Sequence, residues 1–171
     1  IEAMLAILEA EGRASVTNFQ VGDLRLDAGS VVFTKSTCTE GEGLLSGLSF
    51  EAEATKLKSP WIELKSASVT GELRRLLTDK RFSQFHDAAG SLRVKAAGIK
   101  SQGISVSKLE SQVSLLSLTG SSSSGLVPNS LAVATLYAEK IKYGKNSVAK
   151  FELELDGTQS SGLITANGQV E

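Results

Sequence analysis

Residues 91–116 have the sequence SLRVKAAGIKSQGISVSKLESQVSLL, which carries the plainest strand pattern in the chain. Leu92, Val94 and Ala96 alternate with serine, arginine and lysine, and a similar polar–apolar alternation returns after Gly103. A period of two places every second side chain on one face of a β-strand. The stretch therefore predicts short antiparallel strands with one dry and one wet face, separated by glycine turns.

The same alternation recurs along most of the chain, with turn signals spaced by roughly ten residues. We expect a turn or β-bulge at Gly22-Asp23, a further turn at Ala28-Gly29-Ser30, and a hairpin around Gly144-Lys145-Asn146. Gly98, like Gly103, is expected to separate two short strands. The predicted fold class is mainly β: an antiparallel meander sheet, forming a curled groove or a sandwich, with one or two short helices.

Residues 1–171 are expected to form a single β-rich domain, or a segment of a longer repeated β-groove. Residues 1–11 have apolar side chains at helical spacing and precede a glycine, which predicts a short helix. Residues 72–88 show near-helical spacing of leucine and phenylalanine, which predicts a helical insert. Residues 119–130 are rich in serine and glycine and are expected to form a flexible loop. Because the chain begins with Ile1 rather than methionine, we expect it to be part of a longer protein.

Composition limits the partners that this chain can have. Charged residues make up 22% of the chain and its formal net charge is −1. This near-balance argues against nucleic-acid binding, which needs a basic surface, and against a strong overall attraction to membranes. It leaves room for local basic faces. No stretch approaches the ~20 apolar residues of a membrane-spanning helix.

Residues suited to catalysis or metal binding are scarce. His86 is the only histidine and Cys38 the only cysteine, so the usual zinc ligand sets are excluded. Asp87 is adjacent to His86 in sequence and is poorly placed to orient it as in a catalytic triad. The carboxylates of Glu152 and Glu154 share a strand face, as solvated strands commonly show. We therefore expect a non-enzymatic protein with no catalytic residue, no metal site and no cofactor.

The apolar strand faces must be covered by a second sheet, by helices, or by an apolar ligand or partner. The residues alone favour a self-packed sheet with a dry core. A trough that binds acyl chains is the other interpretation, because burial of methylenes is non-directional. Its predicted lipid-binding residues are the aliphatic and aromatic ones that alternate along the later strands: Leu92, Val94, Ile104, Val106, Leu115, Leu131, Val133, Phe151, Leu153 and Leu155.

Two stretches resemble the repeated meander of AsmA-like proteins, the bacterial envelope family that includes the TamB type. One is residues 92–120, LRVKAAGIKSQGISVSKLESQVSLLSLTG, and the other is residues 1–33, where an Ala/Leu-rich segment precedes ASVTNFQVGDLRLDAGSVVF. The resemblance implies a long β-sheet curled into a groove that carries phospholipids between membranes, and a periplasmic location. It implies no catalytic residue.

The sequence thus predicts an extracytoplasmic β-groove segment that binds phospholipid acyl chains or another apolar ligand, or supports lipid transport in the cell envelope. Membrane contact is expected through regions outside this segment, and edge strands are expected to allow pairing with further strands. The alternative is a structural or adhesive β-solenoid or sandwich segment of a surface protein, with a closed aliphatic core. A fragment of an enzyme whose site is completed elsewhere is the third interpretation.

Overall fold

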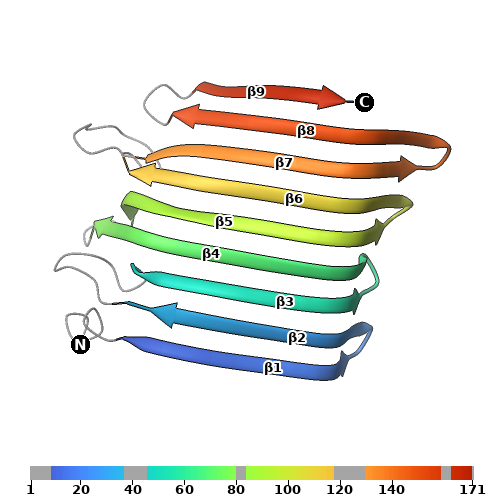
Figure 1. Ribbon diagram of the computed structural model, residues 1–171, viewed down its shortest axis with the longest axis horizontal. Helices are drawn as coiled ribbons and strands as arrows, with labels where there is room; N and C mark the ends of the chain where they lie inside the picture. Colours follow the sequence, from blue (N-terminus) through green and yellow to red (C-terminus); the bar gives the residue numbers. More distant parts are fainter. Residues whose placement is uncertain (1–8, 37–45, 80–83, 118–129, 159–162, 171) are drawn as a thin grey trace.

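The computed structural model of the chain describes residues 9–36, 46–79, 84–117, 130–158 and 163–170. These residues form one antiparallel sheet whose strands follow one another in chain order (Figure 1). The strands are β1 (Ala10–Val21), β2 (Leu24–Lys35), β3 (Leu48–Lys58), β4 (Glu63–Asp79), β5 (Gln84–Ser101), β6 (Ile104–Ser117), β7 (Ser130–Tyr143), β8 (Asn146–Thr158) and β9 (Leu163–Val170). For several strand ends and for all of β9, the backbone alone is described.

The predicted antiparallel meander is confirmed, and the sheet stays open because β1 and β9 each pair with one neighbour only. The turns expected at Gly22-Asp23 and around Gly144-Lys145 join β1 to β2 and β7 to β8. The described residues contain strands and turns but no helix. Accordingly, that part of the chain includes no helix long and apolar enough to cross a membrane.

The helical insert predicted for residues 72–88 is wrong, because β4 extends to Asp79 and β5 begins at Gln84. The pairing of β4 with β5 shifts register between Leu73 and Arg75 and again farther on. A register shift changes the spacing of residues that share a face, and so imitates a helical period. Residues 1–8 of the predicted helix 1–11 lie outside the described residues, whereas Ala10 and Glu11 belong to β1. The loop predicted for 119–130 lies outside them except for Ser130, the first residue of β7.

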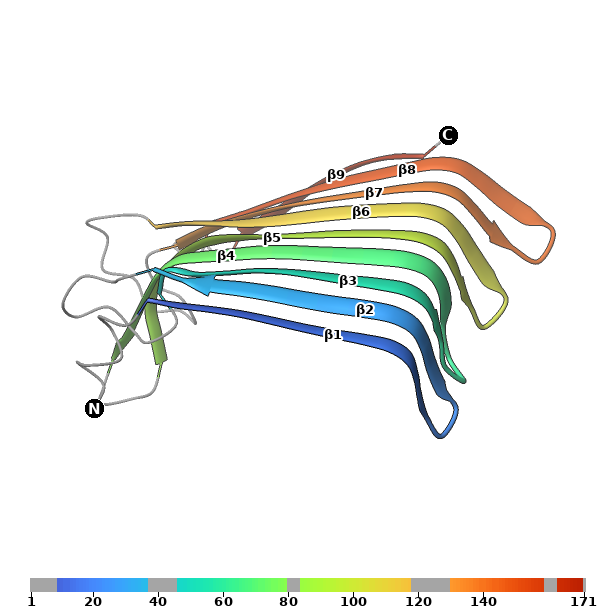
Figure 2. The same cartoon turned by 60° about the horizontal axis from the view of Figure 1, so that its bottom comes forward.

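The turn predicted at Ala28-Gly29-Ser30 is also wrong, since β2 passes through these residues without interruption. Gly98 likewise lies inside β5. Of the two glycines expected to separate short strands, only Gly103 does so, in a turn with Gln102. A sharp bend runs across β1 to β8 near their hairpin turns (Figure 2), and Gly98, with a positive φ angle, lies in it. A glycine inside a strand often marks such a bend or a close backbone approach.

The bend has the same backbone cause in every second strand. Asn18 in β1, Lys56 in β3, Gly98 in β5 and Lys140 in β7 all have positive φ angles, between 49° and 64°. The pairings on both sides of these residues bring them into one line across the sheet, perpendicular to the strands. A left-handed residue inside a strand turns the chain sharply. The strands therefore bend together, near the four hairpin turns.

Each strand keeps its apolar side chains on one face of the sheet through the bend. Leu26 lies beyond the bend and Gly29 before it, three residues apart, yet a methyl group on Gly29 would lie 2.9 Å from Leu26 Cδ2 and 3.5 Å from Val16 Cγ1. The alternation is therefore shifted by one residue at the bend. Among the residues whose side chains are described, the two buried hydrophobic ones, Leu64 and Ala138, lie beside the bend on this same face. We conclude that the sheet bends toward its apolar face.

Two phenylalanine rings shield glycines on the apolar face. Gly12 pairs with Phe33 and Gly71 pairs with Phe50, and a methyl group on either glycine would collide with the partner's ring. An aromatic ring laid over a cross-strand glycine covers backbone that would otherwise be bare. Each ring thereby fixes the local register of its strand pair.

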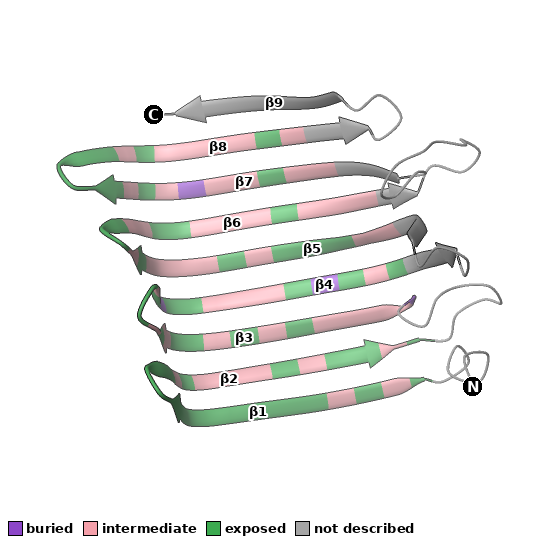
Figure 3. Cartoon of the chain, turned by 180° about the vertical axis from the view of Figure 1, so that it is seen from behind, coloured by how far each residue is buried: buried purple, intermediate pink, exposed green. Residues whose placement is uncertain are grey.

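The described residues form a single layer, and no second layer of them covers the apolar face. Most residues are half-buried or exposed (Figure 3). Large apolar side chains on this face remain open to solvent, including Val31 and Phe33, each 41% exposed. Large exposed apolar patches often mark surfaces that bind a partner or ligand, so this face is the candidate site.

Candidate functional site

A row of mostly small residues runs along the apolar face beside the bend, and we call it the floor. Successive strands contribute one residue each, and each residue pairs in register with the next. The floor residues are Val16, Gly29, Ala54, Ala67, Ala96, Leu109, Ala138 and Phe151. Four consecutive members, from Gly29 to Ala96, are glycine or alanine. At about 4.8 Å between strands, this small-residue part is about 14 Å long.

Larger side chains stand on both sides of the floor and make it the bottom of a trough. Beyond the bend, the wall residues are Phe19, Leu26, Leu57, Leu64, Ile99, Val106, Ile141 and Val148. Before the bend, they are Ala14, Val31, Ala52, Val69, Val94, Ser111, Leu136 and Leu153. The trough therefore runs across the strands, along the inner side of the bend.

The first half of the trough holds a hollow. A hollow of about 310 Å³ lies between its walls, lined mainly by Leu26 on one side, by Val31 and Val69 on the other, and by Ala54 and Ala67 beneath. Its width follows from the floor, because glycine and alanine leave the space that a leucine would fill. The hollow is open on one side along its length.

The chemistry of the trough is almost wholly apolar. Ser111 supplies the single polar side chain among the floor and wall residues, and none of them is charged. A polar ligand would lose its hydration here without finding partners. An aliphatic ligand would gain about 0.8 kcal/mol for each buried methylene.

Nine of the ten predicted lipid-binding residues can be placed with their side chains. Eight lie on the apolar face: Leu92, Val94, Ile104, Val106, Leu115, Phe151, Leu153 and Leu155. Val94, Val106 and Leu153 are trough walls, and Phe151 ends the floor. Val133 instead lies on the polar face, opposite Ser114. The backbone of Leu131 pairs with Thr158, and its side chain is outside the described part.

The prediction for Val133 is wrong because an apolar residue in a strand does not by itself show which face it lies on. The segment from Leu131 to Leu136 has apolar residues in both parities, so its composition does not decide which set faces inward. The prediction from sequence also missed the residues at the base of the hollow, Gly29, Ala54 and Ala67. Small residues give a weak hydrophobic signal, although Ala52 and Ala54 alternate visibly with glutamates.

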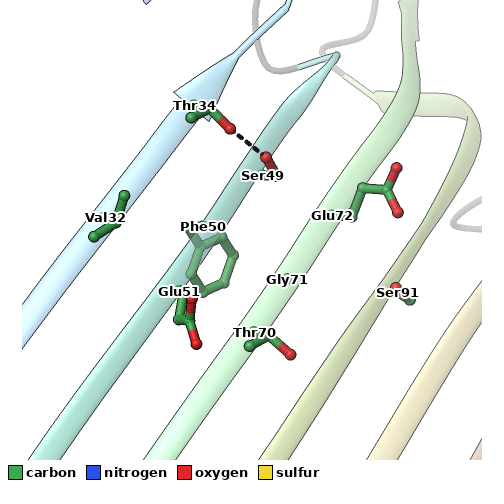
Figure 4. Close-up of a pocket in the computed structure, with 9 residues that line it drawn as sticks. All are labelled: Val32, Thr34, Ser49, Phe50, Glu51, Thr70, Gly71, Glu72 and Ser91. Atoms are coloured by element: carbon green, nitrogen blue, oxygen red, sulfur yellow. Dashed lines mark hydrogen bonds between the residues drawn. The ribbon is translucent and has the colours of Figure 1, made fainter. Parts of the chain in front are cut away.

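The opposite, polar face carries a shallow hollow over β2 to β5 (Figure 4). Hydroxyl and carboxylate side chains line it, and Thr34 and Ser49 share a hydrogen bond there. Glu72 in this hollow is ion paired with Arg74, at 3.1 Å between Oε1 and Nε. Among the described residues, no group of three or more His, Cys, Asp or Glu side chains is placed to hold a metal ion.

A network of charges surrounds Tyr137 on the polar face. Its hydroxyl shares a 2.5 Å hydrogen bond with Glu139, which raises the pKa of the phenol. The ammonium groups of Lys108 and Lys150 lie 5.4 and 5.5 Å from its ring centroid. Lys108 also contacts Glu110 at 3.2 Å, and this bond lowers the pKa of that carboxyl. These contacts join β6, β7 and β8 on a solvated face.

The side chains of the one cysteine and the one histidine are not among the described parts of the chain. Cys38 lies outside the described residues, and His86 is described by its backbone in β5 alone. The expectations of no catalysis, no metal and no cofactor therefore stay predictions.

No protein-family model, curated protein or solved structure matches this chain significantly.

Proposed function

We propose that this chain binds lipid acyl chains in the trough and serves lipid transport without catalysing a reaction. The observation that carries the proposal is the floor of glycine and alanine between two aliphatic walls. The trough that they form is open along its length and has no charged side chain. An acyl chain matches such a surface because it is narrow, apolar and without hydrogen-bonding groups.

The direction of the trough sets the pose of the ligand. An acyl chain lying on the floor would run across the strands, from β1 toward β8, with the head group outside the walls. A trough that continues from strand to strand has no closed end within the described sheet. That form suits passage of a lipid along the sheet better than permanent storage.

The resemblance to AsmA-like proteins supports the same function and an extracytoplasmic, periplasmic location. The alternative of a structural segment with a closed core needs a cover for the apolar face, and the described residues do not supply one. Pairing of further strands onto β1 or β9 stays a prediction; it would lengthen the same trough.

The floor provides a matched pair of variants that tests the proposal. Ala54 pairs with Ala67 on the floor, and the adjacent pair, Thr55 with Ser66, lies on the polar face. The double variant Ala54→Phe/Ala67→Phe fills the hollow with two rings. The control Thr55→Phe/Ser66→Phe adds the same rings to the opposite, exposed face.

Titration with a dansyl-labelled fatty acid measures the outcome, and native mass spectrometry of protein purified without detergent detects lipid that co-purifies. We expect the wild-type chain and the Thr55/Ser66 control to bind the probe, and the Ala54/Ala67 variant to lose at least tenfold in affinity while keeping its β-sheet circular dichroism. Equal binding by both variants, or no uptake by the wild-type chain, would overturn the proposal.

A further inference from the structure

The bend divides the charges of this nearly neutral chain very unevenly. From the bend outward lie four hairpin ends, residues 18–27, 56–65, 98–107 and 140–149, which we call the flange (Figure 2). The flange holds eight lysine or arginine residues against three carboxylates. Its cations are Arg25, Lys56, Lys58, Lys65, Lys100, Lys140, Lys142 and Lys145, and its anions are Asp23, Asp27 and Glu63. Since the whole chain has a net charge of −1, the rest of it is acidic.

The register places many of these cations together on the polar face of the flange. Arg25 pairs with Lys58, and Glu63 lies between Lys58 and Lys100 in the same row. Farther along this row, Lys142 follows Ser105. The row thus crosses eight strands with four cations and one carboxylate.

Few of the flange charges are neutralised within the sheet. Lys56 donates to Asp27 Oδ2 at 2.8 Å, and this hydrogen bond raises the pKa of the lysine. Among the described residues, it is the one flange cation in an ion pair with a carboxylate. The remaining cations are therefore available to an external anion.

Each hairpin end of the flange also exposes large apolar side chains near its turn. The most exposed in each are Val21, Trp61, Ile104 and Tyr143, with exposures of 60%, 71%, 44% and 61%. Tryptophan and tyrosine are the residues that favour the boundary between lipid head groups and acyl chains. An edge that combines cations with such side chains has the composition of a membrane-surface contact.

The second and third hairpin ends enclose a notch suited to a phosphate. A hollow of about 380 Å³ between them is lined by Lys58, Trp61, Lys100 and Ser101, with Glu63 at its side. Ser101 Oγ donates a hydrogen bond of 2.7 Å to the carbonyl oxygen of Trp61, which ties the two turns together. The notch is lined by two lysines and one glutamate, and this net positive charge favours a single anionic head group.

We propose that the flange docks this chain onto the surface of an anionic phospholipid bilayer. The cations approach the head groups and the four apolar side chains enter the interface. This contact lies within the chain, whereas the sequence alone predicted membrane contact through other regions. The flange forms one long side of the trough, so docking would bring the trough alongside the lipids.

Vesicle binding tests the proposal, using phosphatidylcholine alone and an equal mixture of phosphatidylcholine and phosphatidylglycerol. Trp61 is the only tryptophan of the chain, so its emission reports the environment of one hairpin end. We expect a blue shift with the anionic vesicles that fades with added salt, and little change with the neutral ones. A basic residue near an anionic membrane contributes about fivefold to partitioning. The variant Lys58→Gln/Lys100→Gln/Lys142→Gln should therefore partition about 100-fold more weakly.

The control removes three cations from the polar face before the bend: Arg13→Gln/Arg93→Gln/Lys95→Gln. It should keep at least a third of wild-type partitioning. Equal losses in the two triple variants, a shift of equal size with neutral vesicles, or tighter binding to DNA than to vesicles would each overturn docking. Fatty-acid uptake separates the two proposals: the flange variant should keep it, and the Ala54→Phe/Ala67→Phe variant should lose it but still bind vesicles.

Discussion

The bend makes a prediction in which two substitutions of opposite type change stability in opposite directions. Lys140 and Gly98 occupy equivalent places in the bend, with φ angles of 51° and 64°. We expect Lys140→Gly to stabilise the fold and Gly98→Ala to destabilise it. Lys95, an exposed residue of β5 whose φ is not positive, supplies the control Lys95→Gly.

The magnitudes follow from the backbone. A left-handed conformation costs a residue with a Cβ atom about 1–2 kcal/mol, and glycine loses about 0.4–1 kcal/mol through the greater freedom of the unfolded chain. Lys140→Gly should therefore gain about 0.5–1 kcal/mol. Gly98→Ala should lose about 0.5–1.5 kcal/mol, because its new methyl group would lie 2.6 Å from Lys65 Cγ and displace that side chain. Lys95→Gly should lose about 0.5–1 kcal/mol, as glycine does inside an ordinary strand.

Urea unfolding followed by far-ultraviolet circular dichroism measures these differences. With a slope of about 2 kcal/mol/M, the midpoint should rise by about 0.25–0.5 M for Lys140→Gly and fall for the other two variants. If Lys140→Gly lowered the midpoint as much as Lys95→Gly does, the left-handed backbone would not be the cause of the bend.

Two further predictions concern the two faces of the sheet. Gly71→Val should lower the free energy of unfolding by about 1–3 kcal/mol, because the new side chain displaces the Phe50 ring, whereas Thr70→Val on the exposed face should change it little in the same urea assay. The pKa of Glu110 is lowered mainly by its hydrogen bond with Lys108, so its stabilising contribution is present above its ordinary pKa of 4.5 and is lost as the pH falls through the lower folded value. The urea midpoint of Glu110→Gln should therefore lie below that of the wild-type chain at neutral pH and approach it as the pH falls through the lowered pKa of Glu110, and a constant difference would contradict this.

Strand alternation was sufficient to predict the meander and its two-faced character. The period of two in Leu92, Val94 and Ala96 survives in the structure, because strict alternation of apolar and polar residues there assigns the two faces of the strand. The turns at Gly22-Asp23 and Gly144-Lys145 were predictable for a similar reason, since two-residue hairpins favour glycine. Local sequence therefore determines the strand order of this fold, in which each strand pairs with its neighbours in sequence.

The bend and the trough could not be predicted from that pattern. Glycine marks the bend at position 98, but Asn18, Lys56 and Lys140 adopt the same left-handed backbone. A lysine in a sequence does not predict a positive φ angle. The floor could not be predicted for a related reason. It joins one residue from each of eight strands, and none of these residues is distinctive in the sequence. Only the register shows that Gly29, Ala54 and Ala67 are neighbours.

The bend also explains how a chain of net charge −1 acquires a basic surface. The net charge of the whole chain averages the basic flange with the acidic remainder. For this reason composition argued against a surface attracted to membranes. The backbone places residues such as Lys58 and Lys100, 42 positions apart in sequence, in one row with Glu63 between them. The same line of left-handed residues gathers the small side chains into a floor on its inner side. One backbone feature therefore generates both the apolar trough and the basic edge on which the two proposals rest, and we expect substitutions to separate the two.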